Sequence, residues 1–229
     1  MRKKLVEQAF RAEAGALGAA LAGLDAGEWA RPTRCEPWTV VELLAHVRVA
    51  VGRVEAMLAE PEPEPEPEQA EVTAVGYYRP DERFDAATNR ARIALARDTA
   101  GGDSDPVAAF ERTWHAVAAR FEGEAEARVV RTRHGDPMLL TEFMITRVVE
   151  SAVHGLDLAD ALDRPAWLTD RASDVLEELL LTDVDGASVR AALGWDRATL
   201  LRKATGRAEL DAAERAEVAR AGITWLTLG

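Results

Sequence analysis

The strongest helical periodicity in the sequence lies in residues 141–162, and it constrains the fold more than any other feature. Apolar residues recur there every three or four positions, which is the spacing of one face of an α-helix. The members of this stripe are Ile145, Val148, Val149, Ala152, Leu156, Ala159 and Leu162. A helix with such a face must bury it, and the 44 alanines of the chain favour further helices as its partners.

Start signals and the same periodicity predict the other helices. Thr39 and Glu42 form a capping-box pair, in which the hydroxyl accepts from the third helical N–H and the glutamate reaches back. A helix should therefore begin there and continue through Leu58, after a loop over residues 28–37. Ser104 or Asp105 before Pro106 is a second strong helix start. The remaining predicted helices span residues 2–24, 81–99, 106–121, 170–181, 195–205 and 211–220.

Few segments suit other structure. Residues 128–133 have the composition of a short strand, and a turn at 134–137 completes a small hairpin. Residues 223–228 are a second candidate strand. The alternating Pro and Glu of residues 60–68 forbid a helix and favour an exposed, extended loop. The sequence thus predicts a mainly α fold, with a four-helix bundle over residues 1–164 and a small α(+β) appendage over residues 165–229.

Composition excludes several classes of protein. With 28 Lys and Arg against 40 Asp and Glu, the chain carries a formal charge of -12, so we expect no nucleic-acid partner and no binding to anionic membranes. The single cysteine, Cys35, excludes an internal disulfide and a structural zinc site built on two or more cysteines. Because there is neither a signal-peptide pattern nor a long apolar run, we expect a cytoplasmic protein.

Ionisable residues interrupt two of the apolar helices. Glu150 and His154 are four residues apart and share a helix face, which Asp157 extends by a turn. His46 lies in the apolar helix that begins after Thr39. Two imidazoles and a carboxylate can hold a catalytic zinc ion with one open position, or form the facial triad of non-haem iron. The same spacing is also typical of a surface Glu–His pair and a buried histidine with a satisfied hydrogen bond.

A resemblance to a known family rests on these same residues. The segment that ends at His46, Cys35-Glu-Pro-Trp-Thr-Val-Val-Glu-Leu-Leu-Ala-His46, resembles the Cys-Pro-x-Trp-Thr-Val-x-Asp-Leu-x-Ala-His motif of the mycothiol-dependent maleylpyruvate isomerase family. Residues 147–159 resemble its second motif, Glu-x-x-x-His-x-x-Asp-Leu-Ala. The resemblance covers about residues 1–165. It implies a DinB-like metal-binding four-helix bundle, although Glu36 replaces the proline of the first motif.

The resemblance also implies a chemistry. His46, Glu150 and His154 would bind a divalent metal ion, with zinc preferred, and Asp157 would either orient a ligand imidazole or face solvent. Mycothiol, a low-molecular-weight thiol cosubstrate, would bind at the open position as its thiolate. Attack on a small electrophile would then give a thiol conjugate or, with a cis-unsaturated acid, an isomer. The implied function is a mycothiol S-transferase or isomerase; the alternative is a noncatalytic DinB-like protein that binds a metal or a small molecule.

Two further features have weaker signals. Arg202 and Arg207 belong to a basic cluster that could bind a substrate carboxylate, or could complement the dipole of a helix end. Cys35 is interpreted as a small apolar residue at a loop end, because nothing in the sequence places His115 or His134 beside it as a base. The expected partners are the thiol and the electrophile, and the expected state is a monomer or homodimer.

Overall fold

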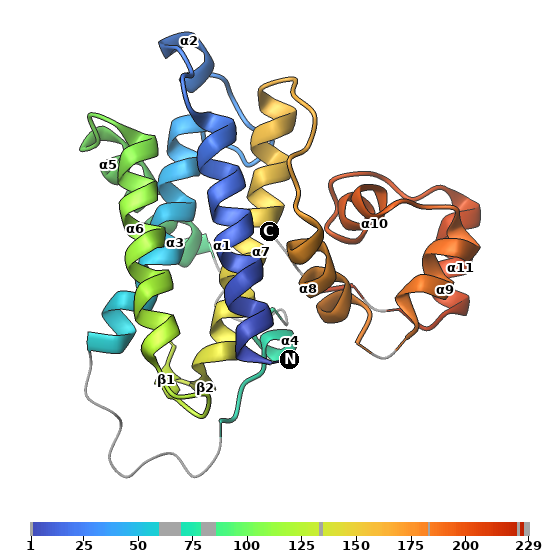
Figure 1. The fold of residues 1–229 in the computed structure, drawn as a ribbon. Coiled ribbons are helices and arrows are strands. Elements are labelled where there is room, and N and C mark those ends of the chain that lie inside the picture. The colour runs from blue at the N-terminus through green and yellow to red at the C-terminus, as the bar shows by residue number, and fades with distance from the viewer. Residues whose placement is uncertain are drawn as a thin grey trace.

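The computed structural model describes residues 2–59, 70–78, 86–132, 135–182, 184–223 and 225–226, and four long helices form its centre (Figure 1). Helices α1 and α3 each lie beside both α6 and α7, so α1 is diagonally opposite α3. Helices α1 and α7 run in one direction, and α3 and α6 run in the other (Figure 1). The bounds of these helices are α1 (Lys3–Leu21), α3 (Val40–Ala59), α6 (Pro106–Gly123) and α7 (Leu140–Ala161). The predicted four-helix bundle is confirmed.

Helix α7 is the most deeply buried of the four. Its bounds differ by one residue at each end from the helix that the apolar stripe predicts. Helices α1, α3 and the more C-terminal α8 (Asp170–Leu180) pack against it, and the short helix α4 (Ala74–Tyr77) also covers it. Polar side chains of α7 are buried as well, including Arg147 at 1% exposure and Asp157 at 0%. Buried polar groups of this kind need hydrogen-bond or charged partners inside the protein. Helix α7 is therefore the first place to look for a functional site.

The predicted helix starts are mostly confirmed at the level of single hydrogen bonds. Glu42 accepts from the backbone N–H of Thr39 at 2.9 Å, as predicted, but the Thr39 hydroxyl, which was expected to accept from the third helical N–H, donates to the same carboxylate instead. Asp105 accepts from the N–H of Ala108 at 2.9 Å and so caps α6. These contacts satisfy N–H groups that have no partner within their own helices.

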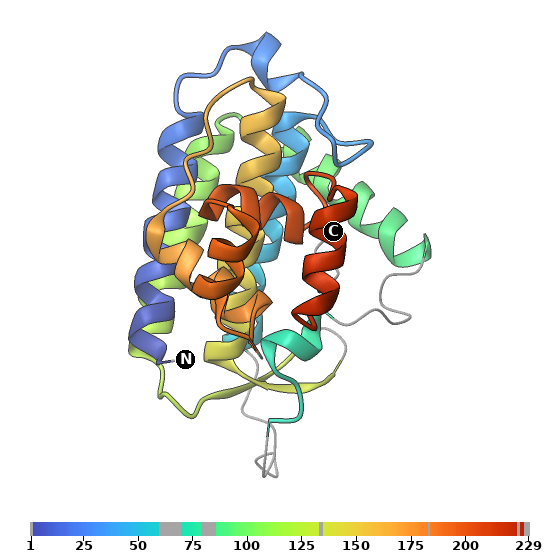
Figure 2. The same cartoon turned by 90° about the vertical axis from the view of Figure 1, so that its right-hand side faces the viewer.

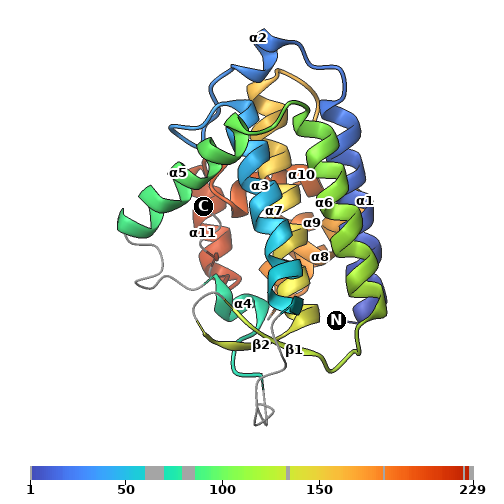
Figure 3. The same cartoon turned by 90° about the vertical axis from the view of Figure 1, so that its left-hand side faces the viewer.

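A small hairpin and a crossover connect the long helices. Strands β1 (Val129–Arg131) and β2 (Pro137–Leu139) pair antiparallel between α6 and α7, which confirms the predicted hairpin; residues 133 and 134 of its turn lie outside the described part. Helix α5 (Ala86–Gly101) packs on α3 and runs diagonally across it (Figure 3). The first residues of the predicted helix 81–99, and the Pro–Glu repeat at 60–68, also lie outside the described residues.

The C-terminal appendage is helical and covers one side of the bundle (Figure 2). Helix α8 packs on α1 and α7, and α10 packs on α8. Its helices are α8 (Asp170–Leu180), α9 (Gly186–Leu193), α10 (Arg197–Ala204) and α11 (Ala212–Arg220). The strand predicted at 223–228 is wrong for residues 223, 225 and 226, which are not in a strand; its other residues are outside the described part. None of the described helices combines the length and apolarity needed to cross a bilayer.

Three short helices were not predicted. Helix α2 (Ala26–Trp29) corrects the beginning of the predicted loop 28–37, and it is held by a capping box between Asp25 and Glu28. Helices α4 and α9 were also missed. Elements of four to eight residues show too few turns for an apolar periodicity to appear, so their capping contacts are the better signal.

A buried glutamate joins the appendage to the bundle. Glu13 of α1 is 1% exposed, and its Oε2 accepts from the backbone N–H of Thr169 at 2.9 Å and from its hydroxyl at 2.6 Å. We expect Glu13→Ala to lower the free energy of unfolding by about 2 kcal/mol, because it leaves the N–H and hydroxyl of the half-buried Thr169 without their acceptor. Urea unfolding would measure the loss. Glu7→Ala on the same helix removes only an i,i+4 pair with Arg11 and should cost about 0.5 kcal/mol or less; equal losses in the two variants would contradict this role for Glu13.

Candidate functional site

The structure brings His46 of α3 together with Glu150 and His154 of α7. One carboxylate oxygen, Glu150 Oε2, lies 3.4 Å from His46 Nε2 and 3.5 Å from His154 Nε2. The three potential ligand atoms all lie within 4.8 Å of one another. Ligand atoms about 2 Å from a tetrahedral zinc ion are about 3.3 Å apart. The distances from Glu150 Oε2 to the two imidazole nitrogens, 3.4 and 3.5 Å, therefore fit a shared ion. Two imidazole nitrogens and one carboxylate oxygen are also a donor set that zinc accepts.

Neighbouring side chains hold both imidazoles in place. The Nδ1 of His154 lies 3.0 Å from Asp157 Oδ2, so the N–H at that nitrogen donates to the carboxylate and Nε2 is the nitrogen that faces Glu150. The ring of His46 stacks on Trp38, with ring centroids 4.5 Å apart. The two imidazoles meet edge to face, with centroids 5.1 Å apart. The cluster is therefore oriented by its surroundings, which is a common requirement of metal-binding histidines.

Glu150 and His46 are in the protonation states that coordinate a cation, whereas the pKa of His154 is raised, so an ion at its Nε2 would have to displace a proton. Burial alone would raise the pKa of Glu150, but hydrogen bonds from His154 and His46 and the charge of Arg147 hold that pKa well below its usual range. Burial lowers the pKa of His46, which keeps its ring neutral near pH 7. A charged carboxylate and a neutral imidazole are the forms that coordinate a metal ion.

Arg147 is a buried counter-charge that the sequence analysis did not identify. Its Nη2 lies 3.9 Å from Glu150 Oε1, and its Nη1 donates to the backbone oxygen of Ala50 on α3. The guanidinium also lies over the ring of Phe143. The sequence signal that could have indicated this contact is the spacing, since an arginine three residues before a glutamate on a helix lies on the same face. Arg147 thus compensates one oxygen of Glu150 and leaves the other to the histidines.

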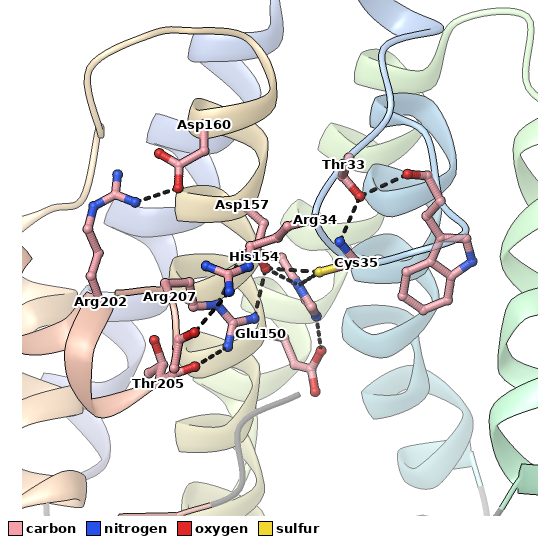
Figure 4. Close-up of polar contacts among 12 residues, drawn as sticks. Thr33, Arg34, Cys35, Glu150, His154, Asp157, Asp160, Arg202, Thr205 and Arg207 are labelled. Carbon is pink, nitrogen blue, oxygen red and sulfur yellow. Dashed lines mark hydrogen bonds and ion pairs between the residues drawn. The ribbon is translucent and has the colours of Figure 1, made fainter. Parts of the chain in front are cut away.

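Asp157 connects the cluster to the C-terminal appendage (Figure 4). Its side chain is fully buried, and the guanidinium of Arg207 donates to both of its oxygens at 3.0 and 2.8 Å. Burial alone would raise the pKa of Asp157, but the hydrogen bonds from His154 and Arg207 hold it far below its usual range. Burial alone would lower the pKa of His154, but its hydrogen bonds with Asp157, Cys35 and Glu150 raise that pKa well above the ordinary value. The sequence is compatible with both alternatives for Asp157, and in the structure its side chain contacts His154 and does not face solvent.

Cys35 lies at this network, which its sequence context did not reveal. Its Sγ donates to Asp157 Oδ2 at 3.2 Å and lies 3.9 Å from His154 Nδ1 (Figure 4). Cys35 is at a loop end, as expected, but it has polar partners and is not simply an apolar filler. Of the two histidines considered as a base, His115 bonds to a backbone oxygen of α6, and His134 lies outside the described residues.

A second potential ligand group, formed by Cys35, His154 and Asp157, is less suited to a cation. Its three ligand atoms also lie within 4.8 Å of one another. However, both oxygens of Asp157 already accept from the guanidinium of Arg207, whose side chain is 4% exposed. A fixed positive charge at this position opposes a metal ion. The group that contains His46 and Glu150 is therefore the better candidate metal centre.

The two predicted anion-binding arginines lie in different places. Arg207 lines the cavity at the cluster, where Asp157 is its partner. Arg202 is in the last turn of α10 and forms an ion pair with Asp160, and it is not among the described residues that line the cavity. Lys203 pairs with Glu214. Both guanidinium groups thus have a carboxylate partner within the chain.

The candidate metal centre lies in the wall of a cavity of about 550 Å³. Helices α3, α5 and α7 form most of this wall, and the rest comes from loop residues 34–36, Trp38, Tyr77 and Tyr78 at the end of α4, and residues 205–207. A cavity of this volume accommodates a small organic ligand. The arrangement can therefore place a small molecule beside a bound cation, and the appendage contributes to that site.

Comparisons with known proteins show which sequences and folds this chain is similar to. The sequence profile for the mycothiol maleylpyruvate isomerase N-terminal domain matches residues 10–159. Two uncharacterized proteins of Mycobacterium tuberculosis, from strains CDC 1551 / Oshkosh and ATCC 25618 / H37Rv, are each 30% identical over 168 residues, covering 69% of this chain and 57% of their own length. The chain therefore spans little more than half the length of these relatives.

A solved structure has a similar fold. The crystal structure of the mycothiol-dependent maleylpyruvate isomerase matches with a TM-score of 0.51 and 12% identity, over 79% of this chain and 70% of that one. At such low identity the likeness concerns the fold alone. It confirms the mainly α, DinB-like architecture that the sequence motifs implied.

Proposed function

Because this chain belongs to the mycothiol maleylpyruvate isomerase N-terminal domain family, we propose that it is a divalent-metal-dependent enzyme that uses mycothiol to conjugate or isomerise a small electrophile. The observation that carries the proposal is the convergence of His46, Glu150 and His154 in the wall of a cavity. These three residues would hold the ion, and their donor set suits zinc best. When bound, the ion supplies a positive charge that favours the thiolate form of a thiol in the cavity.

The chain's own residues prepare the site for this chemistry. Asp157 accepts from His154 Nδ1 and so directs Nε2 toward Glu150. Arg147 balances the charge of Glu150, which lowers the cost of burying a carboxylate. Trp38 covers one face of His46 and limits access of water to the ring. Together these contacts support a preorganised ligand set in the wall of the cavity.

We propose that residues 1–164 form a metal-binding bundle and residues 165–229 an appendage. Both parts contribute residues to the site. The bundle supplies the cluster, and residues 205–207 of the appendage supply part of the cavity wall. The appendage would then help to shape the site and hold Asp157 through Arg207. It is a component of the proposed enzyme, and the two parts are best tested together.

Two assays on the full chain test the proposed function, one that follows isomer formation and one that follows thiol consumption by conjugation. Protein loaded with one equivalent of zinc would be mixed with mycothiol and either maleylpyruvate, for isomerisation, or 1-chloro-2,4-dinitrobenzene, for conjugation. We expect turnover or thiol loss above the uncatalysed rate with at least one electrophile. A chelator should abolish it, and added zinc should restore it. Zinc binding with no catalysis of either reaction would contradict the enzyme and support the noncatalytic alternative.

A further inference from the structure

The cavity is positively charged in a protein that is negatively charged overall. The whole chain has a formal charge of -12. Among the described residues that line the cavity, however, there are five arginines and only two glutamates. The aspartates and glutamates that give the chain its net charge are therefore mostly elsewhere. Such a local excess of positive charge attracts and orients small anions.

Four of these arginines already have partners within the chain. Arg207 pairs with Asp157, and Arg147 bonds to the backbone of α3 beside Glu150. Arg34 donates to the backbone oxygen of Gly206 at 2.9 Å. Arg53 is likewise engaged in an interaction. Their guanidinium groups are therefore committed to holding the site together.

Arg92 differs from these four. It lies on α5, is half-buried and lines the same cavity as His46 and Glu150. Its guanidinium donates one hydrogen bond, from Nη1 to Asn89 Oδ1 at 3.1 Å, and no carboxylate pairs with it in the described part of the chain.

We propose that Arg92 is an anion-binding residue that holds a carboxylate of the substrate in the cavity beside the His46, Glu150 and His154 cluster. A guanidinium presents a planar set of N–H groups that matches a carboxylate with two parallel hydrogen bonds. The assignment rests on the proposed function, because the carboxylic acid that Arg92 binds would be the electrophile of the proposed reaction. It names the substrate class as a small carboxylic acid, and it gives the anion-binding role to α5, since Arg202 and Arg207 of the appendage are paired with Asp160 and Asp157.

Equilibrium binding of maleate to the full chain tests this assignment. Maleate is a small dianion, and dimethyl maleate is its uncharged counterpart. Titration calorimetry would be performed without thiol, on both the zinc-loaded protein and the chelator-treated protein. We expect Arg92→Gln to raise the Kd of maleate about 10-fold to 100-fold in both states, which is the range for a lost charge-assisted hydrogen-bond pair. Arg92→Lys keeps the charge without the planar geometry and should recover part of the affinity.

Two controls separate this role from general charge or folding effects. Arg90→Gln makes the same change on the same helix, at an exposed position that is not among the cavity-lining residues, and should change the Kd less than about twofold. The affinity for dimethyl maleate should be equal in the wild type and in Arg92→Gln. Circular dichroism spectra would establish that the variants are folded.

Several outcomes would overturn the assignment. They are no measurable maleate binding, equal maleate affinity in Arg92→Gln and the wild type, or an equal loss in Arg90→Gln. The assay involves no turnover, so it is independent of the proposed reaction. The His46→Ala variant separates the two proposals. If it has no thiol-dependent activity but still binds maleate after chelation, the anion site at Arg92 is supported independently of the proposed reaction.

Discussion

The His46→Ala variant should lose stoichiometric zinc and, with it, thiol-dependent activity. His46 is the only predicted ligand on α3, and its Nε2 lies 3.4 Å from the carboxylate oxygen that also faces His154. Loss of a residue that merely orients a ligand weakens metal affinity about 10-fold to 100-fold. Loss of one of three protein ligands should therefore cost more than about 100-fold. Competition with a chromogenic chelator would measure the affinity, and the thiol assay would measure the activity.

The chain provides a matched control for this experiment. His115 is an exposed histidine on α6, where its Nδ1 contacts the backbone oxygen of Glu111. The His115→Ala variant should bind zinc as the wild type does. Zinc should also raise the melting temperature of the wild type and of His115→Ala, because a ligand that binds only the native state stabilises it, but not that of His46→Ala. Unchanged zinc occupancy in His46→Ala would overturn the ligand assignment.

The Asp157→Asn variant should have the largest effect on stability. It removes the charge that pairs with Arg207, whose side chain is 4% exposed, and it replaces one of the two oxygens that accept from Arg207 and His154 by an amide NH2 group. Breaking a buried ion pair by removing one partner costs about 3–5 kcal/mol, because the other charge stays buried without compensation. Zinc affinity should fall about 10-fold to 100-fold as the orientation of His154 is lost. Urea unfolding of the metal-free protein would measure the first effect, and chelator competition the second.

The neighbouring pair of Asp160 and Arg202 is the control for this variant (Figure 4). Asp160 follows Asp157 on the same helix, but its pair is at the surface, with side chains 41% and 24% exposed. Such pairs contribute about 0–1 kcal/mol. Asp160→Asn should therefore be nearly neutral. A loss in Asp157→Asn as small as that in Asp160→Asn would show that the buried network does not stabilise the fold.

The stability difference between the wild type and Asp157→Asn should depend on pH. The pKa of Asp157 is lowered by folding, so its contribution is present above the unfolded value of about 4 and declines as the pH falls below it. The pKa of His154 is raised by folding, so its contribution is complete below about 6.5 and declines as the pH rises through the folded value. The difference should be largest between about pH 4 and pH 6.5. Urea unfolding curves of both proteins at pH 3.5, 5.5 and 8.5 would measure this difference. A difference that is not largest at pH 5.5 would contradict the prediction.

Local sequence patterns were sufficient to predict the long helices. Helix α7 was predicted to within one residue at each end because its apolar stripe repeats over several turns. Helix α6 was predicted because Asp105 and Pro106 form a start signal that needs no tertiary contact. The short helix α9 and the absence of a strand at residues 223, 225 and 226 were not predicted. Segments of a few residues take their conformation mainly from what they pack against.

By itself the sequence determined the row of Glu150, His154 and Asp157, since residues three and four apart on a helix must share a face. Only the tertiary structure brought His46 to that row and placed Cys35 and Arg207 on Asp157, across sequence separations of 122 and 50 residues. These contacts depend on how the loops before α3 and after α10 pack against α7. That packing is decided by the burial of whole surfaces, which no short stretch of sequence encodes.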